Sequence, residues 1–240
     1  MTGERNSRRQ PFAAPSTPQP EDSSGGRIFA IGDVHGCAER LTRLLARLPL
    51  DRQQDTLLFL GDLIDRGPAT REVMETICRL QQQGVRVVAL LGNHEYLLRE
   101  YQHSGDPALL PFLRANGIEA TLASYGAASQ RGLADLSFMP PAHRELMASL
   151  LPYWETEEFI FVHAGILPDL PLAAHDLPTL CEKRGEFLTH EIQVGKRVIF
   201  GHTPFATPLL TPTKIGIDTG AVYGNLLTAV ELPAVRFYHG

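Results

Sequence analysis

Short apolar runs alternate with segments of helical periodicity along the first part of the chain. The runs 27–31, 56–60 and 85–91 are rich in large apolar side chains, which is typical of buried strands in a parallel sheet. Between them, residues 38–48 place leucines at helical spacing, and residues 69–83 predict a second helix. Because parallel strands need a crossover connection between them, this strand–helix order predicts an α/β fold.

The second part of the chain carries a long helical segment and then further strands. Residues 97–152 are helical in period but are interrupted by glycines and prolines, so we expect a helical cap over the sheet. His143 lies in this segment, and we expect it at the surface or capping a helix. Later apolar runs predict two more strands and then a strand meander that completes a second sheet. The two strands are 158–162 and 197–200, and the meander comprises 214–220, 227–232 and 234–238.

The first 26 residues differ in composition from the rest of the chain. They hold four prolines among Ser, Thr, Gln and Arg, a composition that does not support a packed core, and we expect residues 1–26 to be disordered. Arg8-Arg9 resembles the start of a twin-arginine export signal, but residues 10–15 supply no apolar stretch to complete one. We therefore expect a tail at 1–26 and a single catalytic-size domain at 27–240.

Composition narrows the classes of partner. The net charge of −5 and a pI near 6.0 argue against nucleic acid as a partner, since a phosphate-backbone binder needs a basic face. No apolar stretch approaches the roughly 18 to 20 residues of a membrane-spanning helix. The three cysteines are odd in number and widely spaced, and a reducing cytoplasm is the compartment we expect.

Side chains suited to metal binding or proton transfer follow every one of the main predicted strands. They are Asp33 and His35, then Asp62, Asp65 and Arg66, then Asn93 and His94, and finally His163 and His202. Open α/β sheets bind ligands at the carboxyl ends of their strands, so we expect these side chains to lie together. Crowded carboxylates are costly without compensation, and a bound cation provides it.

Five short motifs carry these residues, in a fixed order between residues 28 and 232. The motifs are Gly32-Asp33-Val34-His35-Gly36, Gly61-Asp62-Leu63-Ile64-Asp65-Arg66-Gly67, Gly92-Asn93-His94-Glu95, His163-Ala164-Gly165 and Gly201-His202-Thr203-Pro204. The chain in this respect resembles the calcineurin-like metallophosphoesterases, and within them the bacterial PPP-type serine/threonine phosphatases. The resemblance implies a two-layered β-sandwich with flanking helices and two metal ions at the strand ends.

The resemblance also implies a role for each motif residue. Asp33, His35 and Asp62 would hold the first metal, and Asp62 would bridge to a second metal held also by Asn93, His163 and His202. A hydroxide shared by the two ions would attack phosphorus directly. Oxygen and nitrogen ligands without thiolate suit manganese, with iron and zinc as alternatives.

Further residues would bind phosphate or transfer a proton. Arg66 and Asn93 resemble the family's phosphate-binding residues, and His94 resembles its general acid, with Asp65 fixing the imidazole tautomer. Arg184 is the candidate for a second phosphate clamp, although Glu182 stands where the family usually has tryptophan. Tyr223 matches a residue near the family's pocket, where packing explains an aromatic side chain nearly as well.

Three functions remain in competition. We expect a serine/threonine protein phosphatase acting on a phosphorylated protein or a small phosphomonoester, because Asp65 and Glu95 match the phosphatases. The alternative is a dinucleoside tetraphosphate hydrolase, whose motifs typically lack the first carboxylate and carry aspartate at the second position. The third function is a non-catalytic scaffold on the same fold, which the full set of ligands disfavours. The sequence leaves the native metal, the physiological substrate and the oligomeric state open.

Overall fold

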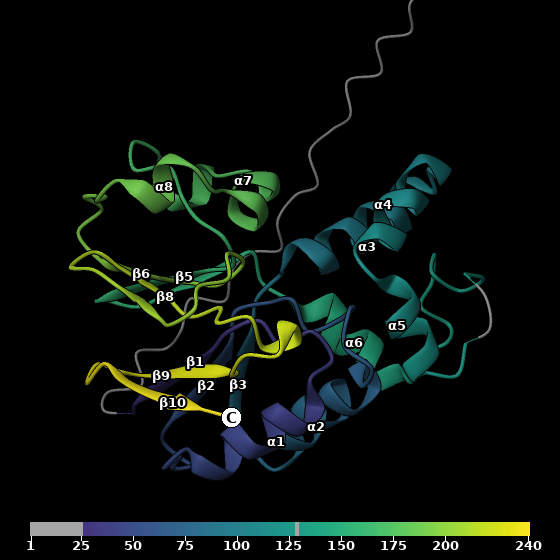
Figure 1. Ribbon diagram of the computed structural model, residues 1–240, viewed down its shortest axis with the longest axis horizontal. Coiled ribbons are helices and arrows are strands. Elements are labelled where there is room, and N and C mark those ends of the chain that lie inside the picture. Colours follow the sequence, from purple (N-terminus) through teal and green to yellow (C-terminus); the bar gives the residue numbers. More distant parts are fainter. Residues whose placement is uncertain (1–25, 128–129) are drawn as a thin grey trace, which may run out of the picture.

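The computed structural model describes residues 26–127 and 130–240, so the predicted disorder of the tail concerns residues that, except Gly26, lie outside this range. Two five-stranded sheets stack face to face, with helices on both outer faces and at one end (Figure 1). This arrangement confirms the predicted α/β sandwich with flanking helices. Within the described residues, no helix is both long and apolar enough to cross a membrane.

The first sheet has the strand order β10-β9-β1-β2-β3. Its strands are β1 (Ile28–Ile31), β2 (Thr56–Phe59), β3 (Arg86–Ala89), β9 (Thr228–Leu232) and β10 (Arg236–His239). β1, β2 and β3 are parallel, as predicted, whereas β9 runs antiparallel to β1 with Ile28 opposite Leu232. The prediction that 227–232 and 234–238 complete the second sheet is therefore wrong. Their apolar pattern predicts strands, but it does not specify which sheet edge they join.

The second sheet has the order β4-β5-β6-β8-β7. Its strands are β4 (Tyr153–Glu155), β5 (Phe159–Val162), β6 (Arg197–Phe200), β7 (Leu209–Leu210) and β8 (Lys214–Gly216). β5, β6 and β8 are parallel, and β4 and β7 are short antiparallel edge strands. The predicted strands at 158–162 and 197–200 are confirmed. The two edge strands have two or three residues each, too few for a readable period.

Alternation of side chains explains the continuous apolar runs of the first sheet. Ala30 and Leu58 face the second sheet, where they pack in one core with Phe161, Ile199 and Ile215. Their neighbours Phe29, Ile31, Leu57 and Phe59 point the other way, into the core under the helices. Because both faces of these strands are buried, neither face can be polar.

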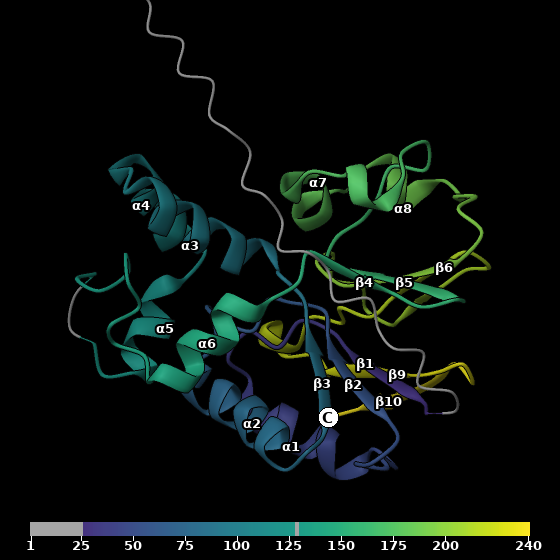
Figure 2. The same cartoon turned by 180° about the vertical axis from the view of Figure 1, so that it is seen from behind.

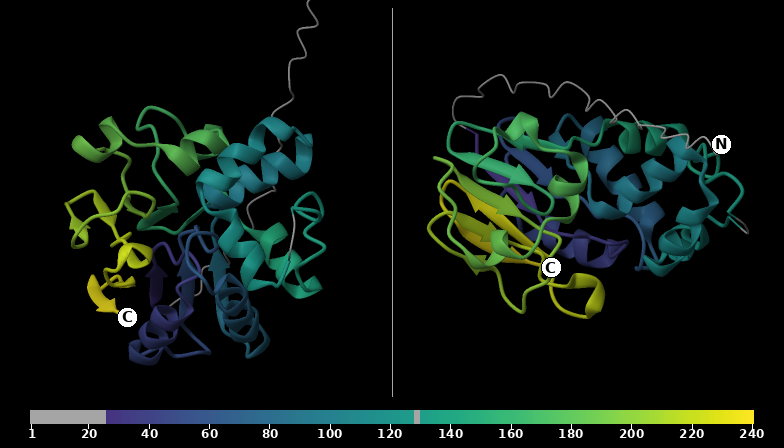
Figure 3. Two further views of the ribbon diagram at one scale, coloured as in Figure 1. Left: turned by 45° about the vertical axis from the view of Figure 1, so that its right-hand side comes forward. Right: turned by 90° about the horizontal axis from the view of Figure 1, so that it is seen from above.

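Helices cover the sandwich on three sides. α1 (Ala38–Arg47) and α2 (Thr70–Gln82) pack on the outer face of the first sheet (Figure 2). α7 (Leu177–Glu182) and α8 (Glu186–Thr189) lie over the second sheet. The predicted helical segment forms a separate group beside the sandwich (Figure 3), comprising α3 (Asn93–Ser104), α4 (Leu110–Ala115), α5 (Ile118–Ser124) and α6 (Pro141–Ser149). Three short 3₁₀ helices, η1 (Pro107–Leu109), η2 (Leu172–Ala174) and η3 (Ala221–Tyr223), lie in the connections.

His143 is buried inside this helical group rather than exposed. Its Nδ1 lies 2.8 Å from the hydroxyl of Tyr125 and its Nε2 lies 3.2 Å from Oε2 of Glu75. The expectation of a surface or capping position is wrong, because α6 packs against α2 and the two ring nitrogens find partners on α2 and beside α5.

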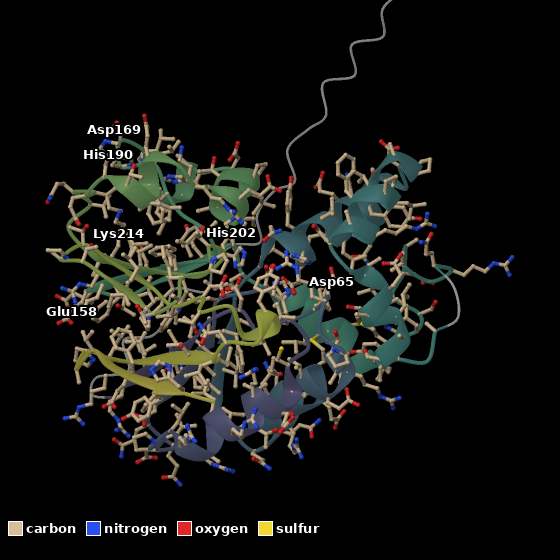
Figure 4. All side chains as sticks on the ribbon, in the orientation of Figure 1. Asp65, Glu158, Asp169, His190, His202 and Lys214 are labelled. Carbon is tan, nitrogen blue, oxygen red and sulfur yellow. The ribbon has the colours of Figure 1, made fainter. Side chains whose placement is uncertain are left out.

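Lys214 is a buried lysine that fastens α8 to the second sheet. Its side chain projects from β8 and is 1% exposed. The Nζ donates to the carbonyl oxygens of Phe187 and His190, each at 2.6 Å, and to that of Leu188 at 3.3 Å. Figure 4 shows Lys214 and His190 on the α8 side of the molecule, away from Asp65. A lysine in this position satisfies the carbonyls that a helix leaves free at its C-terminus.

Replacing Lys214 with Met should lower the free energy of unfolding by about 1–3 kcal/mol, because buried carbonyls lose their donor while the chain length of the side chain is kept. Urea denaturation followed by circular dichroism measures this. Lys183→Met, at a partly exposed lysine close in sequence to α8, is the matched control. Equal stability of the two variants would contradict the anchoring role.

Candidate active site

The ends of strands from both sheets meet on one side of the molecule. In Figure 4, Asp65 after β2 and His202 after β6 both lie on the side facing the α3–α6 helices, whereas Glu158, which precedes β5, lies at the opposite end. Main-chain hydrogen bonds join neighbouring loops: the N–H groups of Val34 and His35 donate to the Asp62 carbonyl at 3.1 and 2.8 Å. The loops that follow the strands are therefore hydrogen-bonded to one another, and together they form what we call the floor of the site.

Left-handed backbone geometry is concentrated in this floor. Among the described residues, seven that are not glycine have positive φ, and five of them are predicted site residues. These five are His35, Asp62, Asp65, Arg66 and His202, with φ between 42° and 68°. Such conformations are unfavourable for side chains with a Cβ and persist where surrounding contacts enforce them, commonly at functional sites.

Two groups of potential metal ligands share the carboxylate of Asp62. One group comprises His35, Asp62 and His94, and the other comprises Asp62, His163 and His202. Oδ2 of Asp62 lies 3.2 Å from Nε2 of His35, and Oδ1 lies 3.5 Å from Nε2 of His163. The two oxygens of one carboxylate thus face two separate groups, as a bridging ligand requires.

Asn93 completes the second group. Its Oδ1 lies 3.1 Å from Nε2 of His163 and 2.9 Å from Nδ1 of His202. The His163 ring is fixed by a contact of 2.8 Å between its Nδ1 and the Leu60 carbonyl oxygen. With Nδ1 as donor in that bond, Nε2 keeps the lone pair that a metal needs.

Asp33 lies at the same floor but outside both groups. Its two carboxylate oxygens each accept the His202 N–H at 3.1 Å. Burial, then the nearby charges of Asp218 and Asp62, raise the pKa of Asp33 well above its usual range. Asp218, which sequence reasoning missed, is 6% exposed and follows β8 in the same way that the other site residues follow their strands.

The donor set and its charges fit divalent cations. Three acidic side chains, Asp33, Asp62 and Asp218, are buried close enough to repel one another. A cation relieves that repulsion. The buried Nε2 of His94 has no hydrogen-bond partner among the described residues, and it lies 3.9 Å from Oδ2 of Asp62. Oxygen and imidazole ligands without thiolate suit manganese, iron and zinc.

The histidines divide into two kinds. Burial lowers the pKa of His163, and burial and then the proximity of His163 lower the pKa of His202 to about 3. Both imidazoles are therefore neutral at pH 7, which is the form that binds a metal. For His94, burial opposes protonation, but the charge of Asp62 and the hydrogen bond with Asp65 outweigh it and raise the pKa.

The family model of the calcineurin-like phosphoesterases matches residues 26–221. The chain belongs to the calcineurin-like phosphoesterases. This membership confirms the predicted resemblance and, with the ligand groups described above, implies divalent metal ions.

Relatives of this phosphoesterase bear a different name from the one we expected. An asymmetrical bis(5′-nucleosyl)-tetraphosphatase, PrpE of Bacillus velezensis, is 29% identical over 242 residues, covering 85% of this chain and 88% of the relative. A crystal structure provisionally described as a diadenosine tetraphosphatase matches with a TM-score of 0.69 and 21% identity, covering 92% of this chain and 95% of that one. A point mutant of a cold-active protein tyrosine phosphatase matches with a TM-score of 0.58 and 17% identity, covering 90% of this chain and 77% of that one.

The expectation of a serine/threonine protein phosphatase is therefore wrong, because relatives that match 85% to 88% of this chain in sequence are named tetraphosphatases. The expectation relied on Asp65 and Glu95, and the structure shows why neither identifies the substrate. Both side chains are buried, with exposures of 0% and 1%. Each side chain instead forms hydrogen bonds that hold other residues of the phosphoesterase in place.

Asp65 joins His94 to the helical group. Its Oδ2 lies 2.8 Å from Nδ1 of His94, and its Oδ1 accepts a hydrogen bond of 2.7 Å from the hydroxyl of Thr121 on α5. The same hydroxyl accepts the Asp65 N–H at 2.8 Å. Thr121 therefore fixes both the main chain and the carboxylate of Asp65. Sequence reasoning missed it because no motif marks a single threonine in a helix.

Glu95 holds the loop after β2 in place. Its Oε2 accepts the N–H groups of Asp62 and Gly92 at 2.9 and 3.1 Å, and its Oε1 accepts those of Leu63 and Ile64 at 2.7 and 3.1 Å. Burial, then the Asp62 carboxylate, raise the pKa of Glu95 to about 7. One carboxylate thus ties the start of α3 to the loop that carries the shared ligand.

The two candidate phosphate clamps stand at different ligand groups. Nη1 of Arg66 lies 2.9 Å from Nε2 of His35, and the guanidinium carbon lies 5.6 Å from the ring centroid of Tyr223. Arg184, on the short connection between α7 and α8, donates from Nε to Nε2 of His202 at 2.9 Å. The structure brings both arginines to the ligand groups, with Tyr223 beside the first of them.

Replacing Asp62 with Asn should weaken metal binding at both positions together, because a single carboxylate serves both groups, and should lower activity on any phosphoester by several orders of magnitude. Metal analysis after dialysis, at matched protein concentration, measures the first effect. Asp169→Asn, at an exposed loop aspartate, is the control. Two retained ions per chain and near-normal turnover in the Asp62 variant would refute the bridging role.

Proposed function

We propose that this phosphoesterase hydrolyses dinucleoside tetraphosphates asymmetrically, releasing a nucleoside triphosphate and a nucleoside monophosphate. The observation that carries the proposal is the similarity, over 85% of this chain and 88% of the relative, to an enzyme named for that activity. The ligand groups and the two arginines support the proposal. A polyphosphate carries several adjacent negative phosphates, which the guanidinium groups and the bound cations of the site would attract.

Two divalent metal ions complete the proposed site. Asp33, His35 and Asp62 hold the first ion, and Asp62, Asn93, His163 and His202 hold the second; manganese is our first choice, ahead of iron and zinc. When bound, the ions supply Lewis acidity, which lowers the pKa of water and stabilises negative charge on phosphoryl oxygens.

The arginines and Asn93 orient the polyphosphate. A guanidinium is a planar donor that suits two phosphate oxygens at once, and Arg66 and Arg184 approach from the His35 and His202 sides of the site. A chain of phosphates bound between them has one phosphorus at the ligand groups and others within reach of an arginine. Asn93, at the N-terminus of α3, adds an amide N–H₂ donor.

In this proposal His94 donates a hydrogen bond to the departing phosphate and can protonate a leaving group that is poorer than a nucleotide. Its Nδ1 is held by Asp65, its Nε2 is free of hydrogen bonds to the described residues, and its pKa is raised. The raised pKa favours the protonated imidazole, whose Nε2–H is then the free donor. The neutral His163 and His202 serve as ligands instead, and divergent environments of this kind separate acids from other groups in active sites.

Incubating the manganese-loaded protein with diadenosine tetraphosphate should give ATP and AMP in equal amounts. Anion-exchange chromatography of the products, at low conversion, measures this directly. The Asp62→Asn protein, prepared in parallel, excludes a contaminating hydrolase. Formation of ADP alone would contradict asymmetrical cleavage, and failure to cleave the dinucleotide while aryl phosphates are hydrolysed would contradict the substrate class.

Replacing His94 with Asn should matter most where the leaving group is poor, since only a poor leaving group needs a proton. With a series of alkyl and aryl esters of AMP, kcat/KM should fall by about 10²- to 10⁴-fold for the alkyl esters and distinctly less for p-nitrophenyl esters. Metal content is measured on the same samples. Parallel dependence of rate on leaving-group pKa in both proteins would show that His94 is not the donor.

Substitutions of Thr121 test the same proton-donor role through Asp65. Thr121→Val removes both hydrogen bonds to Asp65 while keeping the shape of the side chain, so it should steepen the leaving-group dependence in the same direction but less. Thr121→Ser keeps the hydroxyl and should restore the wild-type slope. A Val variant that slows all esters equally would assign Thr121 to folding alone.

A further inference from the structure

Tyr223 is a large aromatic side chain that stays exposed beside the active site. Its side chain is 64% exposed. Most other aromatic side chains among the described residues are buried or half-buried. Phe112 on α4 has a similar exposure of 62%, but it contacts none of the site residues in the way that Tyr223 contacts Arg66. An exposed ring next to a phosphate-binding arginine calls for a reason other than packing.

The turn that carries Tyr223 is held firmly. The N–H groups of Tyr223 and Asn225 both donate to the Gly220 carbonyl, at 3.0 and 3.3 Å. Asp218 accepts the Gly220 N–H at 2.9 Å, and the Asn225 side chain donates to the Ala206 carbonyl at 3.0 Å. Gly220 and Gly224 flank η3 with φ of 71° and 98°, which glycine adopts without strain. The ring is therefore displayed on a pre-organised support and loses little freedom when a ligand covers it.

A continuous series of contacts connects this ring to the ligand groups. The guanidinium carbon of Arg66 lies 5.6 Å from the ring centroid, and its Nη1 lies 2.9 Å from Nε2 of His35. Tyr223 is thus one arginine side chain away from a proposed metal ligand. In a nucleotide, the base lies beyond the ribose from its first phosphate, so the nucleoside attached to a phosphate at Arg66 can reach the exposed ring.

We propose that Tyr223 is a stacking platform for a nucleobase of the dinucleoside polyphosphate, which rests on the function proposed above. Stacking on an aromatic face tolerates every base, because each base has a π-face. The ring therefore selects nucleotides over bare phosphates without reading the base edge. Purines, with their larger ring system, stack more strongly than pyrimidines, so the platform favours diadenosine over diuridine tetraphosphate.

The test compares ligands with and without a base on the manganese-loaded protein. Calorimetry gives the dissociation constants of ATP against tripolyphosphate and of AMP against ribose 5-phosphate, and kcat/KM is measured for diadenosine and diuridine tetraphosphate. The proteins are wild type, Tyr223→Leu, Tyr223→Trp and the control Phe112→Leu. In the Leu variant at Tyr223, the preference for at least one base-bearing ligand over its base-free partner should fall about 5- to 100-fold.

The controls separate stacking from support of Arg66. Tyr223→Trp should keep the preference, since indole also stacks, and Phe112→Leu should leave it at the wild-type value. An equal loss for base-bearing and base-free ligands in Tyr223→Leu would mean that the ring only positions Arg66, and this overturns the platform, as does an unchanged preference. If diadenosine tetraphosphate is not cleaved but the Tyr223-dependent preference for nucleotides is present, the platform stands and the tetraphosphatase activity does not.

Discussion

The structure depends on how it holds several carboxylates together away from water. Asp33, Asp62 and Glu95 are between 1% and 4% exposed, and each is close enough to another to disturb its ionisation. Burying such charges costs far more than a hydrogen bond returns unless each is compensated. The compensation takes three forms: main-chain N–H donors around Glu95 and Asp33, imidazoles around Asp62, and the cations that the donor set accommodates.

This constraint explains the loop geometry. The loops after β2 and β3 approach so closely that a Cβ on Gly61 would lie 2.5 Å from the Gly92 nitrogen, a distance that excludes any other residue. The positive φ of Asp62, Asp65 and Arg66 is maintained by contacts from outside the loop, chiefly Glu95 and Thr121. Helices α3 and α5 therefore help to shape the loop after β2, because Glu95 and Thr121 hold its main chain.

The sequence predicts the parts of this arrangement that have a local signature. Strands β1 and β2 show as apolar runs because both of their faces are buried, and β3 shows as one although three of its four residues are only half-buried. The site residues show because each follows a strand. Thr121, Asp218 and the role of Glu95 have no such signature, since they depend on which helix or loop packs against which. The same limit explains the misplacement of β9 and β10: their pattern specifies a strand, whereas their sheet is decided by tertiary pairing with β1.

The substrate is the feature that motif reading assigned wrongly, and the physical reason is general. Metal-ligand residues must be similar in every enzyme that attacks phosphorus in this way, so they report the reaction and not the molecule that undergoes it. Asp65 and Glu95 lie inside the same buried network as the ligands, and their identity reflects how the loops are held. A tyrosine phosphatase and a protein described as a tetraphosphatase both share this fold with the chain. Discrimination between such substrates must therefore come from groups that touch what lies beyond the reacting phosphate. The stacking platform inferred at Tyr223, whose exposed ring lies against Arg66, is such a group, because it would contact a part of the substrate that the metal ligands do not reach.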